Sequence, residues 1–360
     1  AVSNGSQIMH MMTVIIVGLA MGTTVTIGHS VGAKCMEQAE KIIGNTITLF
    51  MGIAVAFTVI LVALVKPIVV LIATPQEAVA GTSIYLLICF IGIPFITAYN
   101  IISSIFRGLG DSKSPMYFIG IACVMNIALD YLFMGAFHMG AAGAALGTVC
   151  AQTFSVLVAL WVIRRRKTGI SLKKSDFKIE RAVIGQVLKI GIPVALQDGF
   201  IQVAFMIITV IANSRGVSDA AAVGIVEKVI SALFIVPSSM LATVSALSAQ
   251  NFGAGKEKRA TDTLRYATVI TTIYGVIVAV LIQFIAENVV GIFTSDTTVV
   301  TMGSAYIRSY IWDCIFAGIH FSFSGYFAAC GKSYIGFLHN IISITFVRVP
   351  GSYLASKYFT

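Results

Sequence analysis

The fold class follows from one stretch, TITLFMGIAVAFTVILVALV, residues 46–65. Its twenty residues carry no charged side chain, and about twenty apolar residues are what an α-helix needs to cross the hydrocarbon core of a membrane. A strand of an outer-membrane barrel would instead alternate apolar and polar residues over about ten positions. The stretch therefore predicts a transmembrane helix and excludes a transmembrane barrel.

The composition of the whole chain agrees with this interpretation. Of the 360 residues, 58% are apolar and 11% are charged, whereas soluble globular domains carry about 25% charged residues. These values exclude an ordinary soluble enzyme and a disordered protein. The net charge of +9 does not indicate a nucleic-acid partner, because the basic residues lie in loops between long apolar runs. That distribution is typical of a multi-pass membrane protein.

Ten apolar stretches are candidates for membrane-spanning helices. Eighteen lysines and arginines lie in the odd-numbered loops between them, and only Lys66 and Arg215 lie in the even-numbered loops. Basic residues accumulate on the cytoplasmic side, so the odd loops face the cytoplasm. The sequence predicts an all-α, multi-pass protein of the plasma membrane, which in a bacterium is the inner membrane. The predicted spans are residues 6–29, 44–65, 81–106, 115–134, 142–163, 190–213, 219–249, 264–286, 301–329 and 335–358.

The chain also repeats itself at an offset of 221 residues, with 14 identities over the 81 positions from 32 to 112. Many identities fall at helix ends, where Phe106 aligns with Phe327 and Gly110 aligns with Gly331. The register predicts two parallel repeats related by an axis along the membrane normal. The predicted parts are an N-terminal lobe, residues 1–163, a basic cytoplasmic linker, residues 164–189, and a C-terminal lobe, residues 190–360.

Each predicted lobe holds five helices, and the repeat leaves one helix of each lobe without a counterpart. We therefore expect six helices plus six in the complete protein, with one span missing at each end of this chain. Three prolines, Pro94, Pro193 and Pro237, fall inside predicted spans. Each removes a backbone donor from its helix, which favours a kink.

Three local motifs resemble those of one transporter family. The segment SIFRGLGDSKSPM, residues 104–116, is similar to the signature after the fourth helix of multidrug and toxic compound extrusion (MATE) transporters. The segments AQNFGAGK, residues 249–256, and HSVGAK, residues 29–34, resemble the motif that follows a helix in each half of that family. The resemblance implies a twelve-helix antiporter that exports cationic drugs in exchange for Na⁺ or H⁺. We expect the protein to be a monomer. Its expected partners are the cationic substrates and membrane lipid.

Four polar side chains are expected to meet inside the first lobe. Asp130 and Thr148 lie equally far from the short loop centred near residue 139, and Asn126 and Gln152 lie one turn deeper. Carboxylate, amide and hydroxyl oxygens suit an alkali cation, and a desolvated carboxylate can carry a proton instead. The spacing is similar to the cation-binding cluster of the DinF-like branch of the family, where a further aspartate comes from the first helix. Two alternatives remain: Asp130 anchors a helix end, and Gln152 only joins helices.

A second candidate site lies in the C-terminal lobe. Asp313 sits in an aromatic-rich helix with Tyr310, Trp312 and Phe316, and such a wall with one carboxylate suits a cationic, aromatic drug. The alternative is ordinary aromatic packing around a hydrogen-bonded acid. The NorM-like branch carries a glutamate on the helix that opens this lobe, but Gln202 occupies that neighbourhood here. This departure favours the first-lobe cation site.

Other charged residues of the second lobe leave further alternatives open. Glu227 and Arg308 are expected at the same depth, where they can form an ion pair. A lipid-linked oligosaccharide flippase of the same superfamily is the alternative function, and it would need a positively charged cavity. Basic residues inside the predicted spans are few, mainly Lys228 and Arg308. The sequence holds no Walker A motif and no convergent catalytic set, so we expect neither an enzyme nor a cofactor.

Overall fold

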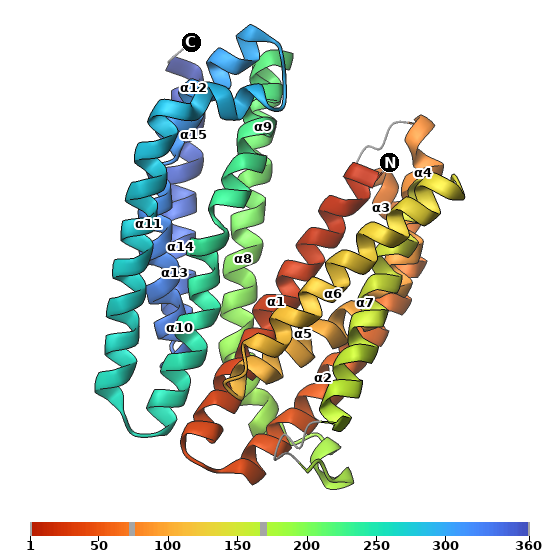
Figure 1. Cartoon of the computed structure of the whole chain (residues 1–360), viewed down its shortest axis with the longest axis vertical. Helices are drawn as coiled ribbons and strands as arrows, with labels where there is room; N and C mark the ends of the chain where they lie inside the picture. The colour runs from red at the N-terminus through yellow and green to blue at the C-terminus, as the bar shows by residue number, and fades with distance from the viewer. Residues whose placement is uncertain (1, 72–75, 166–170, 359–360) are drawn as a thin grey trace. The chain divides into compact units, whose positions relative to one another are not determined.

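The computed structural model of the chain describes residues 2–71, 76–165 and 171–358. Helices dominate these residues, and no strand occurs among them, which confirms the predicted all-α fold (Figure 1). The chain divides into two compact units, Ala1–Ala195 and Leu196–Thr360. The division falls inside one long helix, α8 (Arg181–Arg215).

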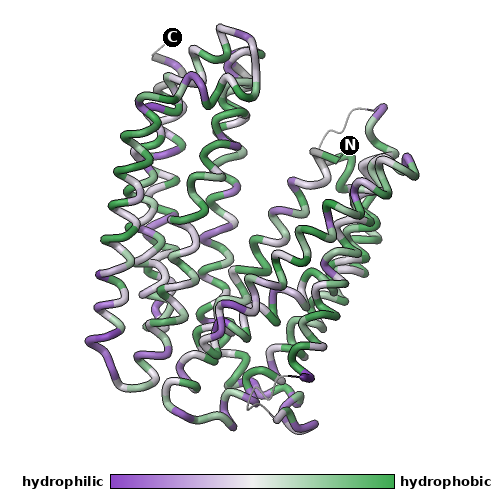
Figure 2. Tube along the Cα trace, in the orientation of Figure 1, coloured by the Kyte–Doolittle hydropathy of each residue, from purple (hydrophilic) through white to green (hydrophobic). Residues whose placement is uncertain are grey.

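The first unit is built from the helices that precede α8 and from the first part of α8. Figure 2 shows that hydrophobic residues follow these helices along most of their length. The helices are α1 (Val2–Gly32), α2 (Met36–Ala63), α3 (Val65–Leu71), α4 (Gln76–Ile91), α5 (Ile93–Gly108), α6 (Lys113–Asp130), the π-helix η1 (Tyr131–Ala136), α7 (Gly140–Arg165) and the short 3₁₀ helix η2 (Lys174–Phe177).

The second unit holds the rest of α8 and the helices that follow it. Within it α10 packs closely against α13 and α11. The helices are α9 (Val217–Leu233), α10 (Ile235–Gly253), α11 (Glu257–Gly291), α12 (Thr297–Tyr310), α13 (Asp313–Ala329), α14 (Tyr334–Ile342), the π-helix η3 (Ser343–Arg348) and α15 (Val349–Tyr358).

All ten predicted spans fall on helices, but the structure interrupts several of them. Among the described residues, seven helical segments are long and apolar enough to cross a membrane, and the bent pair α4 and α5 makes up to eight. The predicted spans 301–329 and 335–358 consist of shorter pieces, α12 with α13 and α14 with η3 and α15. A hydropathy pattern therefore locates the spans without revealing their breaks.

Two of the three prolines inside predicted spans lie at such breaks. The axes of α4 and α5 differ by 48°. Pro94 is the second residue of α5, in the first helical turn. Backbone N–H groups in that turn have no partner within the helix, so the missing N–H of proline costs nothing there. Pro237 is the third residue of α10, directly after the break between α9 and α10. Pro193 remains inside α8. The proline at position 94 therefore marks a bend of the backbone, as expected from its missing donor.

The internal repeat is visible in the geometry of the turns. Gly110 and Gly331, which are 221 residues apart, both have positive φ, 91° and 71°. After each, the next nitrogen donates to a phenylalanine carbonyl oxygen, from Asp111 to Phe106 at 2.9 Å and from Lys332 to Phe327 at 2.8 Å. These are the left-handed helix caps that glycine favours. The two halves of the chain therefore share backbone turns as well as residues.

A second pair of turns repeats at the same offset. Lys34 follows α1 with φ of 59°, and Gly255 follows α10 with φ of 69°. The bond from Cys35 N to Ser30 O, 2.9 Å, has its counterpart in the bond from Lys256 N to Asn251 O, 2.8 Å. The repeat is thus confirmed at both of its loop motifs.

Glycines let α1 and the first part of α8 touch backbone to backbone. A methyl group added at Gly22 would overlap the carbonyl oxygen of Val187, and one added at Gly191 would overlap that of Leu19. Small residues at a helix crossing allow this close approach inside membranes. The crossing fixes the start of α8 on the first unit.

We expect Gly22→Ala to destabilise the protein by about 1–3 kcal/mol, because the backbones would have to separate. The matched control is Gly185→Ala on α8, where an added methyl group meets no atom within 4 Å. This control should be neutral or slightly stabilising, since alanine is the better helix former. Thermal unfolding of the purified variants in detergent measures both effects, and a Gly22→Ala protein as stable as Gly185→Ala would contradict the close crossing.

The predicted linker, residues 164–189, is partly helical. Its residues 166–170 lie outside the described part of the chain, and α8 begins at Arg181, inside the predicted range. The 3₁₀ helix docks on α2 through the Asn45 side chain, whose Nδ2 donates to Asp176 O at 3.1 Å and whose Oδ1 accepts from Glu180 N at 2.6 Å. The segment before α8 is therefore held against the first unit by specific hydrogen bonds.

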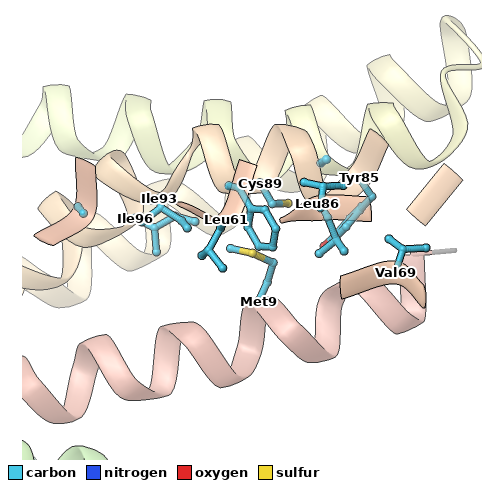
Figure 3. Close-up of a cluster of buried hydrophobic side chains, with 12 residues drawn as sticks. Met9, Leu61, Val69, Tyr85, Leu86, Cys89, Ile93 and Ile96 are labelled. Carbon is cyan, nitrogen blue, oxygen red and sulfur yellow. The ribbon is translucent and has the colours of Figure 1, made fainter. Parts of the chain in front are cut away.

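A buried hydrophobic cluster joins α1 to α5 (Figure 3). Met9 of α1, Leu61 of α2, Val69 of α3, Leu86 of α4 and Ile96 of α5 are among its members. Each is less than 10% exposed. The cluster holds α1, α4 and α5 next to one another.

Candidate functional site

Asp130 is the last residue of α6 and directly precedes the π-helical turn η1. The carboxylate faces α7, because a methyl group added at Gly147 would overlap Asp130 Oδ1. In Figure 1, α6 and α7 run side by side in the first unit. The structure thus brings Asp130 to the residue that precedes Thr148.

Three polar atoms of the predicted cluster are buried without a hydrogen-bond partner among the described residues. They are Asn126 Nδ2, Asp130 Oδ1 and Gln152 Oε1. The Thr148 hydroxyl donates to Ala144 O at 3.0 Å and keeps its lone pairs free to accept. Buried polar atoms normally have partners, and an unpaired one costs about 1–3 kcal/mol. Two of the three atoms are acceptors, which suit a cation, and the third is a donor.

A cavity of about 270 Å³ lies within the first unit, next to this cluster. Thr148 and Gln152 line it, whereas Asn126 and Asp130 do not. The Tyr85 hydroxyl on the cavity wall is within electrostatic range of the Asp130 carboxylate. The complete lining is Ser6, Met9, His10, Thr13, Tyr85, Cys89, Ile96, Tyr99, Asn100, Thr148 and Gln152.

Most of this lining was not among the predicted site residues. Ser6, His10 and Thr13 come from α1, where their spacing of four and three residues puts them on one helical face. Tyr85 and Cys89 lie one turn apart on α4. A polar stripe along an otherwise apolar helix is the signal that would have identified the α1 residues. The cavity therefore combines aromatic rings, hydroxyls and amides with a few apolar side chains.

The predicted second-lobe wall is divided by the structure. Tyr310 ends α12, whereas Trp312 lies in the break before α13. Trp312 and Phe316 are 45% and 67% exposed on the second unit, and no ring contact joins them to Tyr310 among the described residues. Tyr310 packs against Tyr306 instead, with ring centroids 5.7 Å apart.

The side chain that Tyr310 contacts is Arg348, which sequence reasoning missed. Arg348 ends the π-helix η3, and its Nη2 donates to the Tyr310 hydroxyl. Its guanidinium carbon lies 4.6 Å from the ring centroid of Phe205 and 5.8 Å from that of Tyr310. Arg348 is the one charged residue between Lys332 and Lys357, and this isolation in an apolar stretch was the available signal.

Two carboxylates of the second unit are within electrostatic range of Arg348, namely Glu227 and Asp313. Glu227 Oε1 accepts a hydrogen bond from Thr209 Oγ1 at 3.1 Å. The expected pair of Glu227 with Arg308 is wrong, because Arg308 Nη2 lies 3.2 Å from Glu287 Oε1. We refer to the following residues as the Arg348 cluster: Phe205, Thr209, Glu227, Tyr306, Tyr310, Asp313 and Arg348.

Comparisons with solved structures agree with this architecture. The chain is similar to a MATE crystal structure in complex with MaD3S, with a TM-score of 0.93 and 19% identity, over 100% of this chain and 80% of that one. It is also similar to a transporter of the MOP superfamily from Pyrococcus furiosus, with a TM-score of 0.92 and 19% identity, over 99% and 80% of the two chains. At these identities the likeness shows the fold.

Sequence comparisons identify the family. The chain is 30% identical over 344 residues to the probable multidrug resistance protein YpnP of Bacillus subtilis, covering 95% of this chain and 77% of YpnP. It is 24% identical over 314 residues to the multidrug export protein MepA of Staphylococcus aureus, covering 87% of this chain and 69% of MepA. The MatE family model matches residues 1–132 and 193–354. The predicted resemblance is confirmed: this multi-pass membrane protein belongs to the MatE family.

Proposed function

We propose that the protein is a secondary active efflux transporter, which exports cationic amphiphilic compounds in exchange for Na⁺ or H⁺. One observation carries the proposal: the buried, unpartnered Asp130 Oδ1 and Gln152 Oε1 beside a cavity of about 270 Å³. The names of its relatives, multidrug resistance and export proteins, support drug efflux. The two repeated halves support alternating access between an N-terminal lobe, residues 1–163, and a C-terminal lobe, residues 190–360.

The coupling ion is proposed to bind at Asp130, with Thr148 and Gln152 as neutral oxygen ligands. Asn126 would act through its carbonyl oxygen, or donate through Nδ2 to the carboxylate. One carboxylate among neutral groups offers a single negative charge, which matches one Na⁺ or one proton. A charge within a membrane-spanning segment is costly unless it is compensated. A bound Na⁺ or proton would neutralise the Asp130 carboxylate, which would be charged again after the ion leaves.

The substrate is proposed to occupy the neighbouring cavity. Tyr85 and Tyr99 provide aromatic faces, which attract organic cations, and Met9 adds an adaptable apolar contact. None of the lining residues is lysine or arginine. A pyrophosphate-linked lipid would need such residues, so the cavity gives the flippase alternative no support. Asn100 and Gln152 supply the few polar contacts that orient a bound molecule.

The test is ethidium accumulation in bacteria that lack their own efflux pumps. The protein would be expressed in these cells, in medium containing Na⁺ or choline and at several pH values. We expect cells with the protein to accumulate less ethidium than empty-vector cells, and the difference to disappear when the coupling ion is removed. Accumulation equal to that of empty-vector cells in every medium, with the protein present in the membrane, would refute the proposal.

A further inference from the structure

The aromatic rings and carboxylates of the Arg348 cluster form a surface that suits a cation. The Arg348 side chain occupies this surface. A guanidinium lies over the Phe205 ring at 4.6 Å and over the Tyr310 ring at 5.8 Å. Stacking on aromatic faces is how arginine and organic cations are held in proteins. The chemistry that the sequence suggested for a drug is therefore satisfied internally by Arg348.

The charges of the cluster do not cancel. Glu227 and Asp313 contribute two carboxylates against one guanidinium, and both are within electrostatic range of Arg348. Neither carboxylate reaches a guanidinium nitrogen within 4.0 Å, since the described ion pairs of the second unit join other residues. Arg348 thus compensates the acids at a distance while its hydrogen bond goes to the neutral Tyr310 hydroxyl. Such a loose arrangement costs less to break than a direct buried ion pair.

The backbone at Arg348 is irregular, which gives its side chain freedom to relocate. Arg348 is the last residue of the π-helix η3. Pro350 follows two residues later and has no backbone N–H to donate to the preceding turn. Ser352 Oγ donates to Arg348 O at 2.8 Å and stabilises this region in another way. The cation is therefore carried on a helix segment with a weakened hydrogen-bond ladder.

We infer that Arg348 is a tethered cation that competes with organic cations for the aromatic and acidic surface formed by Phe205, Tyr310, Glu227 and Asp313. This inference rests on the proposed function, because it assigns the second unit a site for the same substrate class. Arg348 is then a specificity-determining residue. A monovalent organic cation enters only by displacing the guanidinium, so weakly bound cations are rejected.

The experiment measures ethidium binding to the purified full-length protein by fluorescence titration. Arg348→Gln keeps most of the side-chain stem but removes the charge, and we expect it to lower the Kd by about tenfold, because a competing charge is lost in a low-dielectric site. Arg348→Lys should stay near the wild-type value. The matched control is Arg308→Gln, whose guanidinium pairs with the exposed Glu287 outside the cluster, and it should leave binding unchanged.

A triple variant, Arg348→Gln with Glu227→Gln and Asp313→Asn, makes the test specific. We expect it to lose the gained affinity, because neutral amides would replace the two carboxylates that attract the organic cation. Equal or weaker binding by Arg348→Gln, in protein that unfolds at the wild-type temperature, would overturn the inference. Should that variant be unstable, Arg348→Met preserves the contact with Phe205 and takes its place. Tighter binding by Arg348→Gln, together with a wild-type protein that exports no ethidium from cells, would contradict the proposed function and not this inference.

Discussion

Asp130→Asn will abolish ion-coupled export of ethidium while the protein stays folded. Asparagine has the shape of aspartate, so the packing against Gly147 is kept. It carries no charge, so neither Na⁺ nor a proton has a carboxylate to bind. Removing the carboxylate that the described residues contribute to this site should lower the export rate by at least about tenfold. Ethidium accumulation in pump-deficient cells measures the loss, and thermal unfolding of the purified protein checks the fold.

The control for this prediction is Asp262→Asn. Asp262 lies near the start of α11 in the second unit, outside both candidate sites, and the same chemical change there should leave export unaffected. Asp130→Glu tests geometry instead of charge, because the longer carboxylate must fit beside Gly147. If cells with Asp130→Asn excluded ethidium as well as the wild type at every Na⁺ concentration and pH, Asp130 would not be the coupling residue.

Gly147→Ala will impair coupling without touching a charged group. The added methyl group would occupy the position of Asp130 Oδ1, so the carboxylate must turn away from α7. The carboxylate would then be displaced from the proposed ion site, and the apparent affinity for the coupling ion should fall by about tenfold or more. A displacement of about 1 Å in a binding constellation is enough for losses of this size. The ion concentration that gives half-maximal export measures the change.

Gly120→Ala is the matched control, since Gly120 lies on α6 and an added methyl group meets no atom within 4 Å there. It makes the same chemical change in the helix that carries Asp130. We expect Gly120→Ala to export ethidium with the wild-type ion dependence. Gly147→Ala with unchanged ion dependence would mean that the Asp130 carboxylate is not held where the structure has it.

The helical hairpin around Asp130 could be predicted because its geometry depends only on the positions of two helices and the short loop between them. Two helices joined by a short loop are antiparallel, so residues equally far from the loop lie at the same depth. The contact between Asp130 and Gly147, next to Thr148, agrees with that count. The cation-binding role of the four residues stays a prediction.

The second unit was harder to predict because its helices are interrupted. The predicted span 301–329 assumes one continuous helix, but the break between Tyr310 and Asp313 changes the helical phase. Tyr310 and Asp313, three residues apart, would share one face of a continuous helix, but the structure puts Tyr310 at the end of α12 and Asp313 at the start of α13. Arg308 lies at Glu287 and not at Glu227, with which a pair is expected from the sequence. Backbone breaks depend on tertiary packing, and the apolar pattern of the sequence does not contain them.

The repeat was detectable at loops and not inside helices for a related reason. Apolar residues in membrane helices can replace one another with little cost, so their identity carries little information. A left-handed turn at Gly110 or Gly331 strongly favours glycine, because a side chain there would clash with the backbone. Those positions therefore keep the same residue in both halves of the chain.

The central claim is that ion flow through Asp130 drives export, and transport in proteoliposomes tests it most directly. Purified wild-type protein and Asp130→Asn would be reconstituted, an Na⁺ or H⁺ gradient imposed, and ethidium movement followed by fluorescence. We predict that the wild type moves ethidium against its gradient only while the ion gradient lasts, and that Asp130→Asn does not concentrate it. Concentrative transport by Asp130→Asn, or by the wild type without any ion gradient, would contradict the claim.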